Sequence, residues 1–313
     1  MLGAVLLTVC VFAVLSMLGD VRALRNNLVS FRLPALATAL GLVMVSYLLR
    51  YLRWQYYLRT LGVRVEAALS APIFVAGFVM SVTPGKMGEV IKSFLLNEYR
   101  GISIARTASV VVAERLLDLV ALVLLVSVMG ARLPHGPLIA ALGALLVSGI
   151  VLACTIKSFG LFILDRLEQF RPLARIAPRL RDAYGALYEL TRVRPFLIGA
   201  SYATAGWLLE CLAAWCLIGG FPGVDMSAAG AGFAYAAGTL AGALAMLPGG
   251  LGVAELGMSG LFRVADPQLT LATAAAATIL IRLCTLWFGV ALGGISLASL
   301  RMSKRRKLDN PGG

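Results

Sequence analysis

Long apolar segments alternate with short polar segments along almost the whole chain. Six of the apolar segments are long enough to cross a bilayer as helices, because about 20 residues span the hydrocarbon core. They are residues 2–18, 34–49, 104–130, 137–155, 196–218 and 271–299. The strict alternation of apolar and polar residues that marks the strands of a membrane barrel is absent from the sequence. The pattern therefore predicts an all-α polytopic membrane protein.

Two further apolar segments do not fit a simple span. Residues 67–97 and 228–262 each contain two short halves that meet at a proline-glycine pair, which begins at Pro84 in the first and at Pro248 in the second. Neither second half is long enough to cross the membrane alone. Each segment predicts a broken re-entrant hairpin, which is tolerated at membrane depth only inside protein or beside a wet cavity.

The two broken segments share a sequence pattern. The stretch "TPGKMGEV" in the first resembles "LPGGLGVAEL" in the second, and each is followed by a span with one deep arginine, Arg115 or Arg282. Two apolar spans precede each break. Because each unit has three full spans, the second unit must enter the membrane upside down, which predicts two inverted repeats as in many secondary transporters. The predicted repeats are residues 1–130 and about 137–299.

Basic residues predict the orientation of the chain. It is 60% hydrophobic and only 14% charged, and it carries a net charge of +13. With both termini in the cytoplasm, the inner segments hold nineteen Lys and Arg and the outer segments hold five. Such a bias marks the cytoplasmic side of a membrane protein. We expect both termini on the cytoplasmic side of the membrane and no binding of nucleic acid.

Two basic segments are expected in the cytoplasm, the connector 157–194 and the tail 300–313. The connector mixes apolar and basic residues at helical spacing. It fits either an amphipathic helix on an anionic leaflet or an ordinary solvated connector. The N-terminal segment lacks the basic start and the cleavage site of a signal peptide, so a retained first span is favoured.

The polar stretch "SVTPGKMGEVIKSFLLNEYR" predicts an anion site. A helix that starts near Gly85 directs free amides and the positive end of its dipole into the membrane, and Lys86 adds a full positive charge. The "LPGGLG" turn predicts a second cradle without a lysine. Glycine in both turns would let a ligand approach the backbone closely. The candidate residues are Gly85, Lys86, Gly88, Glu89 and Lys92 in the first cradle, and Gly249, Gly250, Gly252 and Glu255 in the second.

Further charges lie deep inside the predicted spans. They are Glu114, Arg115 and Asp118 within 104–130, Glu210 within 196–218, and Arg282 within 271–299. A charge at the bilayer centre costs at least about 2.5–3.5 kcal/mol, so several of them imply a polar interior that could bind a substrate. Pairing would instead make these charges structural links between helices. The candidate pairs are Glu89 with Lys92, Arg115 with Glu114 or Asp118, and Arg282 with Glu210 or Glu255.

The chain lacks the motifs of several enzyme classes. It has no P-loop and no Asp-x-Asp metal motif, and His135 is its only histidine. Its five cysteines lie in apolar runs without a CxxC pattern, as small packing residues do. We therefore expect no cofactor, no metal site and no ATP hydrolysis, and we favour a transporter over an enzyme.

Four motifs together resemble the flippase-like membrane domain of lysylphosphatidylglycerol synthases. They are "RYLRWQYYLRTLGV", "TPGKMGEVIKSFLL", "AERLLDLVALVLL" and "LPGGLGVAEL". The resemblance implies a role in moving or presenting aminoacylated phospholipids, isoprenoid lipids or lipid-linked glycans. It also implies a protein of the prokaryotic cytoplasmic membrane, such as a cell inner membrane. The synthases carry a soluble aminoacyl-transfer domain after the membrane part, so this sequence is expected to be a stand-alone member that does not aminoacylate. The matching positions are Pro84, Gly85, Gly88, Glu89, Glu114, Arg115, Asp118, Pro248, Gly249, Gly252 and Glu255.

The leading hypothesis is a transporter that moves an anionic lipid between leaflets without ATP hydrolysis. The lipid would be a phospholipid, an isoprenoid or a polyprenyl-phosphate-linked lipid, with Lys86, Arg115 and Arg282 facing its phosphate. Candidate proton carriers are Glu89, Asp118, Glu210 and Glu255. The alternatives are a membrane-embedded lipid-linked transferase and a non-transporting partner of lipid or cell-envelope synthesis enzymes. The sequence does not identify the lipid, the direction, the coupling or the oligomeric state.

Overall fold

The computed structural model describes residues 29–83, 87–131, 138, 141–145, 148–149 and 177–309. Within these residues the chain is helical and contains no strand, so the all-α prediction is confirmed. Several predicted features lie outside the described residues. They are the first span 2–18, most of the span 137–155, and the turn residues Pro84, Gly85 and Lys86.

Three helical stretches in the described part of the chain are long and apolar enough to cross a membrane. They are α3 (Leu33–Thr60), α11 (Val193–Ile218) and the stretch Leu271–Lys304. The last stretch contains α14 (Leu271–Arg282), a π-helical turn called η3 (Leu283–Trp287), and most of α15 (Phe288–Asp309). Their large exposed apolar side chains, such as Leu197 and Ile295, fit a surface that faces lipid.

Helix α6 (Ile104–Gly130) has 27 residues, so it is about 40 Å long and also reaches across a bilayer. It differs from the other long helices because three charged residues, Glu114, Arg115 and Asp118, lie near its middle. All three belong to the candidate site, so α6 carries more of the deep charges than any other described helix.

Helix α3 continues 11 residues beyond the predicted end of the span 34–49. Pro34 lies in the first turn of the helix, where its missing amide hydrogen costs nothing, and Gly62 with φ of 71° follows the end of the helix. The extension carries Arg50 and Arg53, which were assigned to the inner loop. Both are buried in the structure, and ion pairs with other helices make their burial possible.

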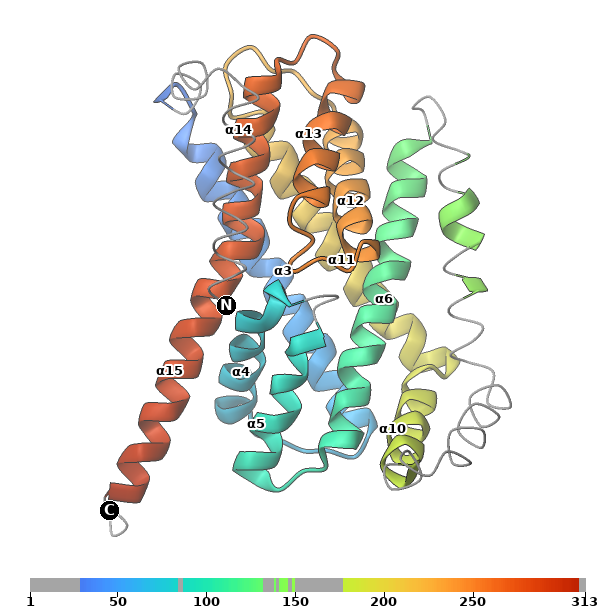
Figure 1. Cartoon of the computed structure of the whole chain (residues 1–313), viewed down its shortest axis with the longest axis vertical. Helices are drawn as coiled ribbons and strands as arrows, with labels where there is room; N and C mark the ends of the chain where they lie inside the picture. Colours follow the sequence, from blue (N-terminus) through green and yellow to red (C-terminus); the bar gives the residue numbers. More distant parts are fainter. Residues whose placement is uncertain are drawn as a thin grey trace.

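Each broken segment forms short helices on both sides of its break. The first contains α4 (Ala67–Ala76), η1 (Gly77–Val82), η2 (Met87–Val90) and α5 (Ile91–Arg100). The second contains α12 (Ala228–Leu244) and α13 (Val253–Ala265). Helices α4 and α5 lie in the lower half of the molecule and α12 and α13 in the upper half (Figure 1). Helix α10 (Ala177–Leu190) and the C-terminal end lie at the lower end.

The two breaks meet in the interior. The Cα atom of Val82, at the end of η1, lies 3.5 Å from the position that a Cβ atom on Gly249 would occupy. Val82 and Leu251 also pack with Leu286 and Val290 in a small apolar cluster apart from the main core. Residues about 170 positions apart along the chain are thus adjacent at the centre of the molecule.

Small residues allow close packing in the upper helix pair. A Cβ atom on Gly238 would lie 2.6 Å from a side-chain carbon of Met258, and one on Gly242 would lie 2.9 Å from the Cβ atom of Ala254. Glycine spaced four residues apart is a common way of bringing two helices together in membranes.

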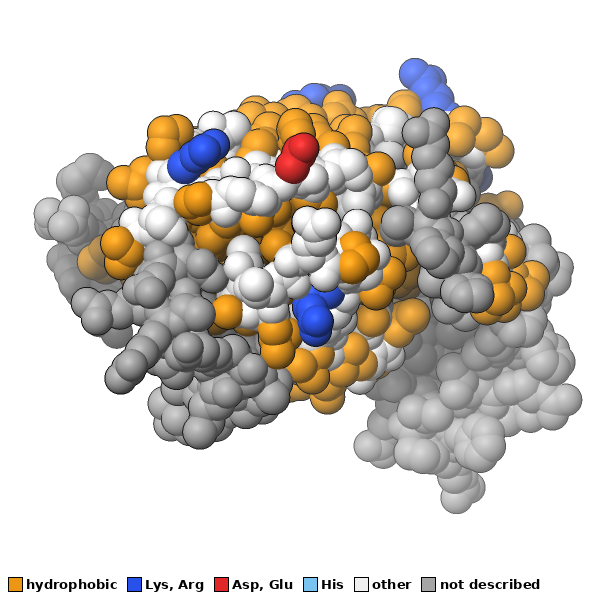
Figure 2. Space-filling view, turned by 90° about the horizontal axis from the view of Figure 1, so that it is seen from above, with side chains coloured by type: hydrophobic (Ala, Val, Ile, Leu, Met, Phe, Trp, Pro, Cys, Tyr) orange, Lys and Arg blue, Asp and Glu red, His pale blue; other side chains and the backbone are white. Residues whose placement is uncertain are grey.

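The upper face of the molecule carries few charged side chains among many hydrophobic ones (Figure 2).

Candidate functional site

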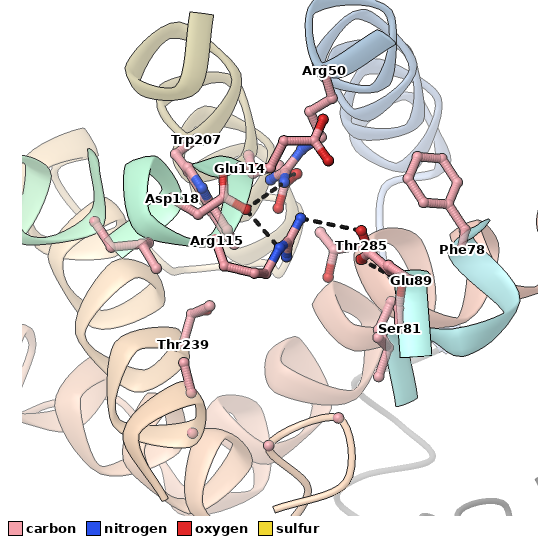
Figure 3. Close-up of a pocket in the computed structure, with 18 of the residues that line it drawn as sticks. Arg50, Phe78, Ser81, Glu89, Glu114, Arg115, Asp118, Trp207, Thr239 and Thr285 are labelled. Carbon is pink, nitrogen blue, oxygen red and sulfur yellow. Dashed lines mark hydrogen bonds and ion pairs between the residues drawn. The ribbon is translucent and has the colours of Figure 1, made fainter. Parts of the chain in front are cut away.

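A cavity of about 290 Å³ lies between the breaks and the long helices. Its lining combines charged side chains of α3, α6 and α11 with apolar side chains such as Phe78 and Leu286. Figure 3 shows charged residues of different helices pointing toward one another around this space.

Arg50 and Arg53 supply positive charge from α3. They lie three residues apart, so they share one face of the helix. Arg50 Nη2 lies 2.8 Å from Glu210 Oε1, and Arg53 Nη1 lies 3.0 Å from Asp118 Oδ1. Arg50 Nη1 also lies 3.5 Å from Asp118 Oδ2, and its guanidinium sits 4.4 Å from the ring centre of Trp207. These two arginines therefore link α3 to α6 and α11.

Both carboxylate oxygens of Glu210 on α11 accept hydrogen bonds. Its Oε1 atom accepts a hydrogen bond from Ser46 Oγ at 3.0 Å and pairs with Arg50, while Oε2 accepts one from Tyr235 OH at 2.5 Å. The carboxylate thus joins α3, α11 and α12. The suggested pairing of Glu210 with Arg282 is wrong, because Arg50 occupies that role.

Lys92 of α5 is buried between two carboxylates. Its Nζ atom lies 2.7 Å from Glu114 Oε2 and 3.5 Å from Glu89 Oε2. The ammonium also sits 4.6 Å from the ring centre of Trp54, a favourable position for a cation. The predicted pairing of Glu89 with Lys92 is present, but the closer partner is Glu114.

Arg115 of α6 bridges the first break and its own helix. Its Nη2 atom lies 3.2 Å from Glu89 Oε2, and its Nη1 atom lies 3.2 Å from Asp118 Oδ2. Figure 3 shows the guanidinium between these two carboxylates. Its side chain is 18% exposed, more than any other ion-paired side chain of the cavity lining. Arg115 does not pair with Glu114, because adjacent residues of a helix face different directions.

These contacts form a continuous ionic chain across the molecule. Its members, in order of contact, are Glu210, Arg50, Asp118, Arg115, Glu89, Lys92 and Glu114, with Arg53 attached to Asp118. Four positive and four negative side chains are present among these residues, so their charges balance. Mutual pairing offsets the large cost of removing each charge from water.

One arginine, Arg282, binds both sides of the second break. Arg282 Nε lies 2.6 Å from Glu255 Oε1, and Arg282 Nη2 donates a hydrogen bond to the carbonyl oxygen of Gly249 at 2.5 Å. The φ angles of Gly249, Gly250 and Gly252 are 62°, 68° and 87°, a backbone region that favours glycine. Glycine is therefore needed here for the turn itself.

Two amides of this second cradle are not free to bind an anion. The amide of Gly252 donates to Glu255 Oε2 at 2.6 Å, which caps α13, and the amide of Gly250 donates to the carbonyl of Leu247 at 2.9 Å. The expectation of an open cradle is corrected for Gly250 and Gly252. Their hydrogen bonds stabilise a folded turn.

Gly88 in the first cradle has a similar structural role. Its amide donates to Thr83 Oγ1 at 2.8 Å, and a Cβ atom on Gly88 would lie 2.6 Å from the Thr83 methyl carbon. The prediction that its amide faces a ligand is corrected, because Thr83 already uses it. Gly85 and Lys86, the centre of this predicted cradle, lie outside the described residues.

A family model described as "Lysylphosphatidylglycerol synthase TM region" matches residues 1–293. The chain belongs to this family. No curated protein matches the chain. As a member of the lysylphosphatidylglycerol synthase TM-region family with membrane-spanning helices, it is an integral membrane protein with a membrane lipid-related role.

Sequence reasoning missed Arg50 and Arg53 in this member of the lysylphosphatidylglycerol synthase TM-region family. Both follow an apolar span, and basic residues there usually mark a cytoplasmic loop. The available signal was their three-residue spacing with no helix breaker before Gly62. With these two residues inside the protein, seventeen inner Lys and Arg remain against five outer ones, so the expected orientation is unchanged.

Proposed function

We propose that this protein moves an anionic lipid between membrane leaflets without ATP hydrolysis. The lipid-related role of the family supports the proposal. The observation that carries it is the position of Arg115, a partly exposed arginine at the cavity beside the meeting point of two broken helices. Arginine binds phosphate through two parallel hydrogen bonds, which makes it well suited to a phospholipid head group.

Arg115 can exchange partners at low cost. Its Nε atom has no hydrogen-bond partner among the described residues, and its two carboxylate partners each contact another cation. A phosphate that displaced Glu89 from Arg115 would therefore leave Glu89 beside Lys92. Lys86, three residues before Glu89, is the second residue that we assign to the phosphate.

The cavity volume fits a head group better than a whole lipid. At about 290 Å³ it lies at the lower limit of ligand pockets, which span roughly 300–1,000 Å³. The acyl or isoprenoid tails would stay in the bilayer while the head group crosses. Apolar lining residues such as Phe78 and Leu286 suit the junction between head group and tails.

We further propose that the molecule consists of two inverted repeats with re-entrant hairpins. Three features support this: the hairpins lie in opposite halves of the molecule, their breaks meet at Val82 and Gly249, and each break is followed by a glutamate that pairs with a deep arginine. Rocking of one repeat against the other would expose the cavity to each side in turn. The end that holds α10 and the C-terminal helix is assigned to the cytoplasm.

Reconstitution tests this function directly. Purified protein in proteoliposomes is expected to make fluorescent phosphatidylglycerol in the inner leaflet accessible to an impermeant quencher, faster than in protein-free liposomes. A panel with polyprenyl phosphate and uncharged diacylglycerol would identify the lipid class, and diacylglycerol should show no acceleration. Equal rates with and without protein for every lipid would reject transport and favour a non-transporting role in lipid synthesis.

A further inference from the structure

Glu114 has the fewest partners of the four carboxylates in the ionic chain. Lys92 Nζ lies 2.7 Å from its Oε2 atom, whereas its Oε1 atom has no hydrogen-bond partner among the described residues. The side chain lines the cavity and is 1% exposed. By contrast, Glu210 contacts Arg50, Ser46 and Tyr235. Glu114 therefore depends on a single cation for its negative charge.

That cation is shared with Glu89. Lys92 Nζ is 2.7 Å from Glu114 and 3.5 Å from Glu89, so a small movement would transfer it from one carboxylate to the other. Glu89 now has a second cation, Arg115, at 3.2 Å. If a phosphate takes Arg115, Lys92 is the nearest cation among the described residues that can replace it at Glu89.

The other groups around Glu114 cannot replace Lys92. Arg53 of α3 is held at 3.0 Å by Asp118, and the hydroxyl of Tyr57 on the same helix is 3.5 Å from the carbonyl of Pro195. Arg115 lies on the same helix as Glu114, but in this state it is bound to the phosphate. In the described part of the chain, Glu114 would then be a buried carboxylate without a cation, and an unpaired buried charge is costly.

We propose that binding of the anionic head group is coupled to uptake of one proton by Glu114. This inference rests on the proposed function, because it begins when the phosphate takes Arg115. Lys92 then moves to Glu89, and a proton from water on the open side of the cavity converts the Glu114 carboxylate into a carboxylic acid. Release of the lipid returns Lys92 to Glu114 and the proton to water. The proton and the lipid therefore cross together, and a pH gradient can drive transport.

Proton uptake can be measured with purified protein in detergent. The protein is placed in weakly buffered solution near neutral pH with an indicator dye, and phosphatidylglycerol is added in the same detergent. Wild-type protein is expected to take up about one proton per bound lipid. Glu114→Gln keeps the size and an oxygen acceptor for Lys92, and adding the lipid to it should cause no proton uptake. Glu98→Gln, which removes an exposed carboxylate paired with Lys304, should behave as wild type.

A second measurement does not depend on any variant. In proteoliposomes with an imposed pH gradient, phosphatidylglycerol should accumulate in the leaflet that faces the alkaline side. Lipid binding without proton uptake, equal uptake by Glu114→Gln, or exchange that ignores the gradient would overturn the coupling and leave the transport function standing. Absence of both binding and exchange in wild type would overturn the transport function, and the coupling with it.

Discussion

Arg115 Nη2 lies 3.2 Å from Glu89 Oε2, and this contact joins the middle of α6 to the first helix break. The second break has the same relationship, with Arg282 Nε 2.6 Å from Glu255 Oε1. In each case a glutamate just after the break meets an arginine in the next long helix. The two sites differ in exposure, because the Arg115 side chain is 18% exposed and that of Arg282 is 7% exposed. We infer that the first pair opens for substrate and the second holds its turn in place.

The contact between Arg50 and Glu210 should contribute strongly to stability. Arg50→Met leaves Glu210 buried without its cation, and we expect the free energy of unfolding to fall by about 3–5 kcal/mol. The double variant Arg50→Met with Glu210→Gln removes both charges and should recover part of this loss. Thermal unfolding in detergent, arranged as a double-mutant cycle, measures the coupling. Strictly additive losses would show that the two side chains do not stabilise each other.

The turn after α12 should not tolerate a side chain at Gly252. Its φ of 87° is strained for any residue with a Cβ atom, so Gly252→Ala should cost about 1–3 kcal/mol. Gly260→Ala is the matched control in the next helix, because a Cβ atom there meets nothing within 4 Å. The control should leave the unfolding temperature unchanged or raise it slightly. Equal unfolding temperatures for the two variants would contradict the strained turn.

Labelling in intact cells tests the orientation. In a background without the native cysteines, Ser303→Cys near the end of α15 should resist an impermeant thiol reagent, because the basic bias places this end in the cytoplasm. The connection between α13 and α14 lies at the opposite end (Figure 1), so Gln268→Cys within this connection should react readily. The reverse labelling pattern would invert the assigned topology.

Much of the fold was predictable because helix length and apolar runs are local properties. The broken segments 67–97 and 228–262 correspond closely to the short helices observed. The pairs Glu89 with Lys92 and Arg115 with Asp118 follow from three-residue spacing on a helix. For Arg282 the sequence left Glu210 and Glu255 open as partners, and the structure pairs it with Glu255.

The remaining site residues depend on contacts between distant parts of the chain. Nothing local indicates that Arg50 would reach Glu210, which is 160 residues away. The amide of Gly88 shows a different limit, because its acceptor is the side chain of Thr83, only five residues away. A free amide and a satisfied amide look identical in sequence. The balance of the ionic chain likewise emerges only when the helices are packed together.

The effect of Arg115 on lipid exchange tests the central claim most directly. Arg115→Met removes the charge that we assign to the phosphate, while its partners Glu89 and Asp118 keep Lys92 and Arg53. The free energy of unfolding should therefore fall by less than the roughly 3–5 kcal/mol expected when a buried charge loses its only partner.

The measurement is the rate of phosphatidylglycerol exchange in proteoliposomes containing equal amounts of folded protein. Arg115→Met should lower the protein-dependent rate at least about tenfold, the equivalent of 1.4 kcal/mol in the barrier. Arg100→Met, which removes an exposed arginine paired with Glu66, should exchange lipid as wild type does. Wild-type exchange by well-folded Arg115→Met protein would contradict the account and leave Arg115 with a structural role alone.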